Sequence, residues 1–348
     1  MICNEQYWSD VKEVIAQIPR VENIKESRIL ITGATGLIGS AITDLFLWLN
    51  KNYGYRIQIF LAGRSEEKMA KRFEAFVEGE DYIYVPYDAS KNCEFDIEVD
   101  YIIHGASNAD PKSYVAQPVD TMLANLIGTN SLLKFAYEHQ SRRLLYISSS
   151  EVYGKKNDAT PYMEDDYGFI DIIRPRACYP CSKRAAETLC ISYGMQYGVD
   201  TVIVRPGHIY GPTILDSDSR ASAQFTRNAV NNEDIVMKSA GVQKRSYCYM
   251  LDCASAIITV LLNGKMGEAY NISNKDSVVT IRELAEALAD YAGTNVIFEC
   301  PSDEEIKGYN MMENSSLDAK KLENLGWKAC FDLKRGVNRT ISNLRLQK

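Results

Sequence analysis

Apolar and polar residues alternate along the first half of the chain in blocks that predict strands followed by helices. Four short apolar runs are each typical of a buried strand, at residues 28–32, 57–62, 100–107 and 143–150. Three intervening segments have apolar residues spaced three or four apart and predict helices, at residues 41–50, 65–76 and 121–140. Strands that alternate with helices in this way indicate βαβ units. We therefore expect an α/β fold with a doubly wound parallel sheet.

The two ends of the chain depart from this alternation. Apolar residues from Trp8 to Ile18 have helical spacing that Pro19 ends, and beyond a further strand expected at residues 201–212 the alternation becomes irregular. Thr280 and Glu283 have the pattern of a capping box at the start of a later helix. The expected divisions are an extra helix at 1–25, a main domain at 26–206 to which 246–263 returns, and a smaller C-terminal α/β lobe at 207–245 and 264–345.

Composition and charge exclude several classes of protein. Hydrophobic residues make up 46% and charged residues 24% of the 348 residues, as in globular proteins. The net charge of −7 provides no general attraction to nucleic acid or to an anionic membrane. The cysteines number nine and the N-terminus has no basic segment before an apolar run, so we expect reduced thiols in the cytoplasm. With three histidines and one C-x-x-C pattern, we expect no metal site.

The first candidate binding motif is the glycine-rich segment between the first predicted strand and helix. It has the form GxxGxxG, and glycines there let the backbone approach a pyrophosphate. The N–H groups at the start of the helix meet the negative charge of that pyrophosphate. We therefore predict a dinucleotide site of the Rossmann type. The expected contacts in this segment are Gly33, Thr35, Gly36, Leu37, Ile38 and Gly39.

The end of the second predicted strand bears on which dinucleotide binds. In NAD-binding folds this strand usually ends with an acid that binds the ribose 2′-hydroxyl. Here the strand ends at Gly63 and Arg64, and an arginine can pair with a 2′-phosphate. We therefore expect tightly bound NAD or NADP, with Arg64 favouring NADP.

A second pattern with chemical meaning is Tyr179 followed by Lys183. Residues four apart share one face of a helix, and a nearby ammonium lowers the pKa of a phenol. A phenolate could then take a hydroxyl proton while hydride leaves the same carbon. Ser149 and Glu151 stand at the end of the strand predicted at 143–150, where open α/β sheets place their active sites.

Together these motifs resemble the extended short-chain dehydrogenase/reductase family, and more narrowly its nucleotide-sugar epimerase/dehydratase branch. The resemblance covers residues 28–330 and also rests on residues 125–129, 205–212 and 245–252. It implies an NAD(P)-dependent enzyme with a Rossmann domain for the cofactor and a smaller lobe for a nucleoside-diphosphate sugar. It also implies a homodimer.

The resemblance assigns roles residue by residue. Tyr179 resembles the base that takes the proton of the sugar C4 hydroxyl, and Lys183 the residue that holds the nicotinamide ribose. Ser149 resembles the hydroxyl residue that bonds the C4 oxygen. Arg245 resembles the arginine that binds the substrate diphosphate, a role that suits a bidentate guanidinium. The other implied cofactor contacts are Asp88, Ala89, Gly105, Ala106, Ser107, Asn125 and Pro206, and the other implied substrate contacts are Asn108, Ser150 and His208.

Glu151 bears on the reaction. Once C4 is a ketone, the C5 proton is acidic, and a carboxylate could remove it and start the loss of the C6 hydroxyl. This is the logic of a 4,6-dehydratase, which is the leading expectation. A uronate decarboxylase, in which the 4-ketone makes the substrate a β-keto acid, and an epimerase are the alternatives. A binding module that senses the cofactor without turnover is an alternative of another class.

Two positions depart from the patterns of the family. Ser150 stands where many dehydratases have an aspartate that acts as the acid for the leaving hydroxyl. His208 stands where the family often has an asparagine before Tyr-Gly-Pro. A dehydratase mechanism would therefore need another proton donor, and the binding of the diphosphate would differ in detail.

Overall fold

A seven-stranded parallel sheet forms the centre of the protein in a computed structural model that describes residues 4–109, 111–301 and 312–347. Its strands are β1 (Arg28–Thr32), β2 (Gln58–Gly63), β3 (Ile83–Pro86), β4 (Tyr101–His104), β5 (Arg143–Ile147), β6 (Thr201–Pro206) and β10 (Ala269–Ile272). Their order is β10-β6-β5-β4-β1-β2-β3. All neighbouring pairs are parallel. The strand order reverses between β1 and β4, which confirms the expected Rossmann-type sheet.

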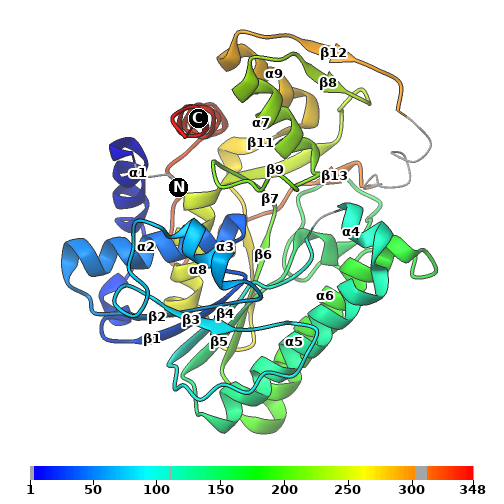
Figure 1. The fold of residues 1–348 in the computed structure, drawn as a ribbon. Coiled ribbons are helices and arrows are strands. Elements are labelled where there is room, and N and C mark those ends of the chain that lie inside the picture. Colours follow the sequence, from blue (N-terminus) through cyan, green and yellow to red (C-terminus); the bar gives the residue numbers. More distant parts are fainter. Residues whose placement is uncertain (1–3, 110, 302–311, 348) are drawn as a thin grey trace.

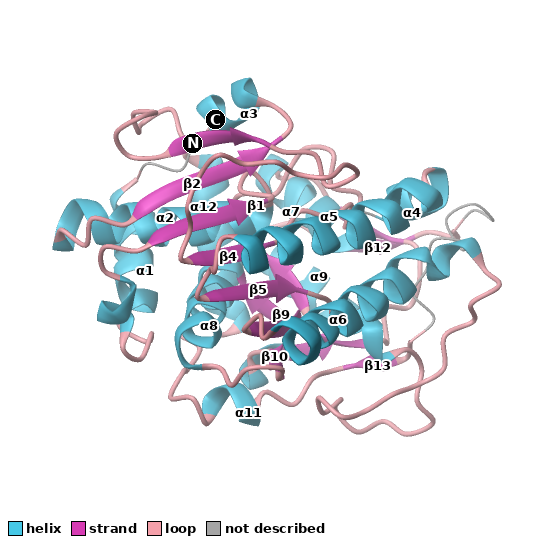
Figure 2. Ribbon diagram, turned by 90° about the horizontal axis from the view of Figure 1, so that it is seen from below, coloured by secondary structure: helices cyan, strands magenta, loops and turns pink. Residues whose placement is uncertain are grey.

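Helices cover both faces of this sheet (Figure 2). They are α2 (Leu37–Tyr53), α3 (Glu66–Arg72), α4 (Pro111–Ala116), α5 (Pro118–Glu138), α6 (Cys178–Tyr197) and α8 (Met250–Asn263), with the 3-10 helices η2 (Ser150–Tyr153) and η3 (Pro175–Ala177). Because successive strand residues face opposite sides, Ile29 and Ile31 join a core with residues of α2 and α8, whereas Leu30 joins a core with residues of α5 and α6. Among the described residues, no helix is long and apolar enough to cross a membrane.

A second lobe lies beyond the ends of β6 and β5 (Figure 1). Its strands are β7 (His208–Tyr210), β8 (Ile235–Met237), β9 (Lys244–Tyr249), β11 (Val278–Thr280), β12 (Val296–Phe298) and β13 (Asn314–Ser315), and its helices are α7 (Ala221–Asn231), η4 (Lys275–Ser277), α9 (Ile281–Ala292), α11 (Lys320–Glu323) and α12 (Leu333–Arg345). Strand β9 pairs with β7, β11 and β13, and β8 pairs with β12. The expected capping box of Thr280 and Glu283 is present at the start of α9, and Gly293 caps the other end of that helix with φ of +72°.

The chain crosses between the two lobes at other points than the sequence suggested. The expected return to the main domain at 246–263 begins instead at α8, because residues 244–249 form β9 of the second lobe. Strand β10, expected in the second lobe, is the edge strand of the main sheet and pairs with β6. The four residues of β10 have no arrangement of apolar and polar positions that indicates which sheet the strand joins.

The N-terminal segment connects both lobes. It forms α1 (Glu5–Ile15) and η1 (Val21–Ile24), and α1 lies between α2 and α12 in Figure 1. Tyr7 donates a hydrogen bond to Asp44 of α2 at 2.5 Å. On its other side, Glu13 forms a bidentate ion pair with Arg335 of α12, at 2.7 and 2.5 Å. The predicted N-terminal helix therefore links α2, which follows the glycine-rich turn, to the C-terminal helix α12.

Candidate active site

The parallel sheet brings the carboxyl ends of its strands to one edge, and the candidate site lies there. The glycine-rich turn follows β1, residues 105–108 follow β4, and η2 follows β5. Strand β6 ends at Pro206 and leads directly into β7 of the second lobe. The site is therefore built between the sheet edge and the second lobe, as is usual for open α/β sheets.

The glycine-rich turn has the shape that a dinucleotide requires. Gly33 has φ of +74°, and a Cβ there would lie 2.9 Å from the backbone of Gly105 and Ala106. A Cβ at Gly39 would lie 2.3 Å from the carbonyl oxygen of Gly33. Among the described residues, a Cβ at Gly36 would approach one atom, the carbonyl oxygen of Gly33, at 3.3 Å. The outer side of the turn is therefore open. The turn ends at the N-terminus of α2, where backbone N–H groups would interact favourably with the negative charge of a pyrophosphate.

The loop after β4 is fixed beside this turn. The hydroxyl of Thr32 accepts hydrogen bonds from the N–H groups of Gly105 and Ala106, at 3.2 and 3.1 Å. The hydroxyl of Ser107 donates to Asn125 at 2.7 Å, and the Asn125 amide donates to Ser182 of α6 at 2.9 Å. Asn108 follows in the same loop and is half-buried. The structure therefore brings this group of predicted cofactor contacts together along one path, with Thr35, Leu37 and Ile38 in the neighbouring turn.

Three more predicted cofactor contacts are Arg64, Asp88 and Ala89, and Ala89 lies against the helix that carries Asn125, because a Cβ at Gly128 would be 3.0 Å from its side chain. Arg64 follows β2, while Asp88 and Ala89 follow β3 at the opposite edge of the sheet from β6. Two hydrogen bonds from Ser90 lower the pKa of Asp88, and the nearby charges of Lys91 and Arg64 lower it further. Arg64 therefore lies within electrostatic reach of a carboxylate.

Tyr179 and Lys183 lie on one face of α6 near its N-terminus. The Nζ atom of Lys183 lies 5.8 Å from the centre of the Tyr179 ring. It donates a hydrogen bond to the carbonyl oxygen of Ile147 at 2.8 Å. Burial lowers the pKa of Lys183 to about 7. The hydrogen bond to Ile147, the last residue of β5, thus holds the side-chain nitrogen of Lys183 near the ring of Tyr179.

The phenol of Tyr179 is surrounded by groups with opposing effects. Burial, followed by the negative charge of Glu151, raises the pKa of Tyr179 to about 12. The hydroxyls of Ser149 and Tyr114 and the charge of Arg220 lower it. The ring of Tyr114, on α4, stacks on the Tyr179 ring with 4.5 Å between their centres. The net shift is upward, opposite to the lowering expected from Lys183, and the cation among these influences is Arg220.

Glu151 is held by an arginine that the sequence analysis did not single out. Arg176, in η3, donates to both carboxylate oxygens of Glu151, at 2.7 and 2.9 Å. Its guanidinium also lies over the ring of Tyr114, 5.3 Å from the centre. The hydroxyl of Ser149 accepts the N–H of Glu151 at 3.2 Å, and Ser150 is buried. The structure thus brings together the four predicted catalytic residues, Ser149, Glu151, Tyr179 and Lys183. Both carboxylate oxygens of Glu151 accept hydrogen bonds from Arg176.

The substrate side of the site is lined by basic residues of the second lobe. Arg245 on β9 is buried, and its guanidinium donates to the carbonyl oxygen of Lys244 at 2.8 Å. Among the described residues, no carboxylate forms an ion pair with it. Arg220 pairs with Asp218 at 2.5 Å and donates to the carbonyl oxygen of Ile209 at 3.4 Å. Such guanidinium groups suit an anionic ligand.

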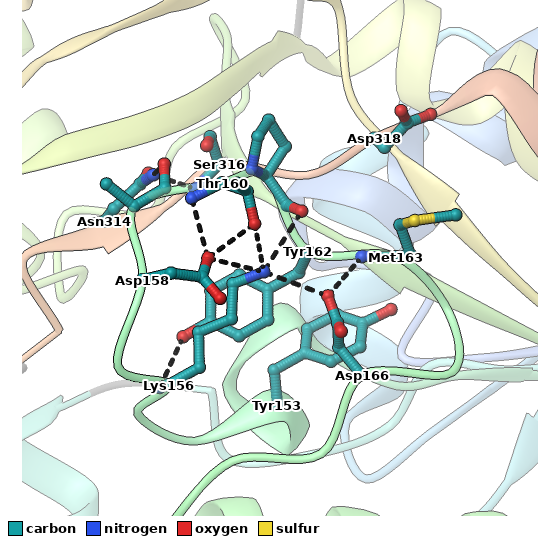
Figure 3. A network of polar contacts seen from close by, with 12 residues as sticks. Tyr153, Lys156, Asp158, Thr160, Tyr162, Met163, Asp166, Asn314, Ser316 and Asp318 are labelled. Carbon is teal, nitrogen blue, oxygen red and sulfur yellow. Dashed lines mark hydrogen bonds and ion pairs between the residues drawn. The ribbon is translucent and has the colours of Figure 1, made fainter.

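The segment between η2 and η3 ties this site to the second lobe (Figure 3). Lys156 donates hydrogen bonds to Thr160 at 2.8 Å and to Asp166 at 3.1 Å, and lies over the ring of Tyr162 at 4.7 Å. The backbone of Tyr162 bonds Ser316 and Asp318, at 2.8 and 2.9 Å. These contacts hold the loop that follows Glu151 against β13.

Three residues in this site were missed by the sequence analysis: Tyr114, Arg176 and Arg220. Arg176 had one available signal, since it stands three residues before Tyr179 and immediately after Pro175. The Asp218-Ser-Arg220 turn and Tyr114 have no distinctive local pattern. Only the packing of η3, α4 and the loop before α7 around the phenol identifies them.

Comparison with known proteins places the chain in a family. Residues 29–273 match the model of the NAD dependent epimerase/dehydratase family. UDP-glucuronic acid decarboxylase 1 from Xenopus tropicalis is 30% identical, over 96% of this chain and 80% of that protein. UDP-glucuronic acid decarboxylase 6 from Arabidopsis thaliana is 32% identical, over 92% of this chain and 89% of that protein. These relatives favour the decarboxylase alternative over the leading expectation of a 4,6-dehydratase.

Solved structures share the fold at lower sequence identity. A UDP-glucuronic acid 4-epimerase from Bacillus cereus, in complex with UDP-glucuronic acid and NAD, matches with a TM-score of 0.76 and 20% identity, over 92% of this chain and 100% of that one. A dTDP-glucose 4,6-dehydratase from Streptomyces venezuelae matches with a TM-score of 0.77 and 24% identity, over 92% and 97% of the two chains. The family match and the relatives at 30% identity or more give the same answer: this chain is an enzyme of the NAD-dependent epimerase/dehydratase family.

Proposed function

We propose that this enzyme decarboxylates a nucleoside-diphosphate uronic acid, with UDP-glucuronate as the substrate, through a transient 4-keto sugar. The observation that carries the proposal is the bidentate pair of Glu151 and Arg176. The names of the relatives at 30–32% identity support it. The reaction releases carbon dioxide from C6 and leaves a pentose on the nucleotide.

The pairing of Glu151 supports one of the two reactions that its sequence pattern allows. A 4,6-dehydratase needs a base that removes the C5 proton, and a carboxylate is a weaker base when a guanidinium stabilises its ionised form. Both oxygens of Glu151 already accept hydrogen bonds from Arg176. Decarboxylation breaks the bond between C5 and C6 and removes no proton from C5. The paired carboxylate therefore suits the decarboxylase.

The residues of the site supply the steps on either side of that bond cleavage. Tyr179 takes the proton of the C4 hydroxyl, and Ser149 bonds the C4 oxygen. NAD, when bound, accepts the hydride from C4 and later returns it. The resulting β-keto acid loses carbon dioxide, and C5 then gains a proton from solvent, because Tyr179 must keep its own proton for return to the C4 oxygen. Arg245 and Arg220 bind the anionic groups of the substrate.

The decisive test is the mass of the product formed from UDP-glucuronate in the presence of NAD. We expect loss of carbon dioxide and, in deuterated water, one deuterium at C5 of the product. UDP-glucose and dTDP-glucose serve as matched substrates without a carboxylate, and neither should change mass. Loss of water from either of them would assign the dehydratase reaction instead. Inversion of one carbon of UDP-glucuronate without a change in mass would assign an epimerase.

The choice between NAD and NADP gives a separate prediction at Arg64. If its guanidinium pairs with a 2′-phosphate, Arg64→Ser should weaken the binding of NADP by about tenfold or more and leave that of NAD unchanged. Titration of both cofactors, followed by tyrosine fluorescence, measures the two dissociation constants. Equal weakening of NAD and NADP binding would show that Arg64 does not distinguish the two cofactors at the ribose 2′-position. Arg56→Ser, at an exposed arginine before β2, is the control.

The oligomeric state remains a prediction from the family resemblance. Helices α5 and α6 lie side by side on one face of the sheet (Figure 2). Both carry exposed apolar side chains, which are Met122, Leu123, Tyr137, Ile191, Met195 and Tyr197. A homodimer through these helices would bury them.

A further inference from the structure

His208 lies among the basic residues of the substrate side. It is the first residue of β7 and pairs in register with Tyr247 of β9, and their rings are 5.7 Å apart. Arg245 stands two residues before Tyr247 on the same strand, so these two side chains share a face. Arg220 donates to the carbonyl oxygen of Ile209, the residue that follows His208. The imidazole therefore has a guanidinium on each of two neighbouring elements.

The surroundings of the imidazole disfavour its protonated form. Its Nδ1 atom is buried and has no hydrogen-bond partner among the described residues. Burial, then the charges of Arg245 and Arg220, lower the pKa of His208 to about 3. The other titratable groups nearby are Tyr247, whose pKa is raised by burial, and Asp218, which is paired with Arg220.

We infer that His208 takes up a proton when the diphosphate of a nucleotide sugar binds, so that substrate binding is linked to pH. Two negative charges beside Arg245 and Arg220 would offset both the effect of burial and the repulsion that lower the pKa of His208. The imidazolium would then add a third positive donor to the diphosphate site. An asparagine, which the family often has at this position, could donate a hydrogen bond but could not titrate. The inference rests on the proposed function only for the binding of a nucleotide sugar.

The test is the binding of UDP-glucose to the enzyme saturated with NAD, measured by calorimetry between pH 6 and pH 8. UDP-glucose is chosen because it has no carboxylate to lose and its diphosphate diester does not titrate in this range. If the bound imidazole has the ordinary histidine pKa of about 6.5, linkage makes binding about fourfold tighter at pH 6 than at pH 8. The same experiment in two buffers of different ionisation enthalpy should show proton uptake at pH 6.5.

Variants assign the proton to its residue. His208→Asn should still bind UDP-glucose but lose both the proton uptake and the pH dependence. His139→Asn, at an exposed histidine beyond α5, should keep both and is the matched control. The chain has three histidines, so the ring ¹⁵N shifts of the unmodified enzyme follow His208 directly even if His208→Asn does not fold.

The outcomes separate this inference from the proposed function. Binding of UDP-glucose without proton uptake, or uptake that persists in His208→Asn, overturns the linkage and leaves the decarboxylase proposal in place. Proton uptake at His208 in an enzyme that does not decarboxylate UDP-glucuronate supports the linkage and overturns that proposal. Failure to bind any nucleotide sugar overturns both.

Discussion

Tyr179→Phe is expected to reduce the turnover of UDP-glucuronate by about 10²–10⁴-fold, the usual contribution of a positioned acid or base. The change removes only the hydroxyl, and the ring can still stack on Tyr114. Oxidation at C4 requires that the hydroxyl proton leave with the hydride, so transient reduction of the cofactor should also disappear. Stopped-flow absorbance of the reduced nicotinamide measures this step, and equilibrium titration should show that NAD still binds.

Tyr197→Phe provides the control for this change. Tyr197 is the last residue of α6 and is half exposed, so it belongs to the same helix as Tyr179 but lies far along it. Its variant should turn over at the rate of the unmodified enzyme. Normal cofactor reduction in Tyr179→Phe would remove Tyr179 from the role of base.

Arg205→Ala is expected to lower the free energy of unfolding by about 3–5 kcal/mol, the cost of leaving one partner of a buried ion pair alone. Arg205, on β6, forms two hydrogen bonds with Glu187 of α6, at 3.0 and 2.7 Å. It also donates to the hydroxyl of Tyr153 and to the carbonyl oxygen of Glu164, at 3.1 and 2.7 Å. Both members of the pair are buried, so water cannot replace the lost contacts.

Urea unfolding followed by circular dichroism measures this effect. Arg282→Ala is the control, because Arg282 pairs with Glu286 at 2.8 Å on the exposed surface of α9. An exposed pair of this kind contributes about 0–1 kcal/mol. Replacing both Arg205 and Glu187 by apolar residues should recover much of the stability lost in Arg205→Ala. A loss for Arg205→Ala no larger than that of the control would show that the buried pair is not a major support.

The sequence was most informative where chemistry depends on local pattern. Apolar periodicity predicted the strands and helices of the main sheet, because a strand buried on both faces and a helix buried on one leave different spacings. The glycine-rich pattern predicted a turn that lets the backbone approach a pyrophosphate, whereas the contact that a Cβ at Gly33 would make with Gly105 came from the structure. Tyr179 and Lys183 are brought to one face by the helix itself.

The reaction is a different matter, because the sequence pattern of Glu151 does not cleanly separate a dehydratase, the leading expectation, from a decarboxylase. The same Ser-Ser-Glu segment is compatible with a base at C5 and with a paired carboxylate. The proposal for a decarboxylase depends on Arg176, which contacts Glu151 across 25 positions of the chain. The sequence favoured the dehydratase because Glu151 was considered there without Arg176, its partner in the structure.

The sequence by itself determined the Rossmann-type sheet, the cofactor turn and the Tyr179–Lys183 pair, because each depends on residues within one turn or one βαβ unit. Only the tertiary structure decided that β10 completes the main sheet, that Arg220 lies near Tyr179, and that burial and the charges of Arg245 and Arg220 lower the pKa of His208. Pairing energies and electrostatic effects of this kind depend on distances between segments that are far apart in the chain. Local pattern does not encode those distances, and the packing of the two lobes sets them.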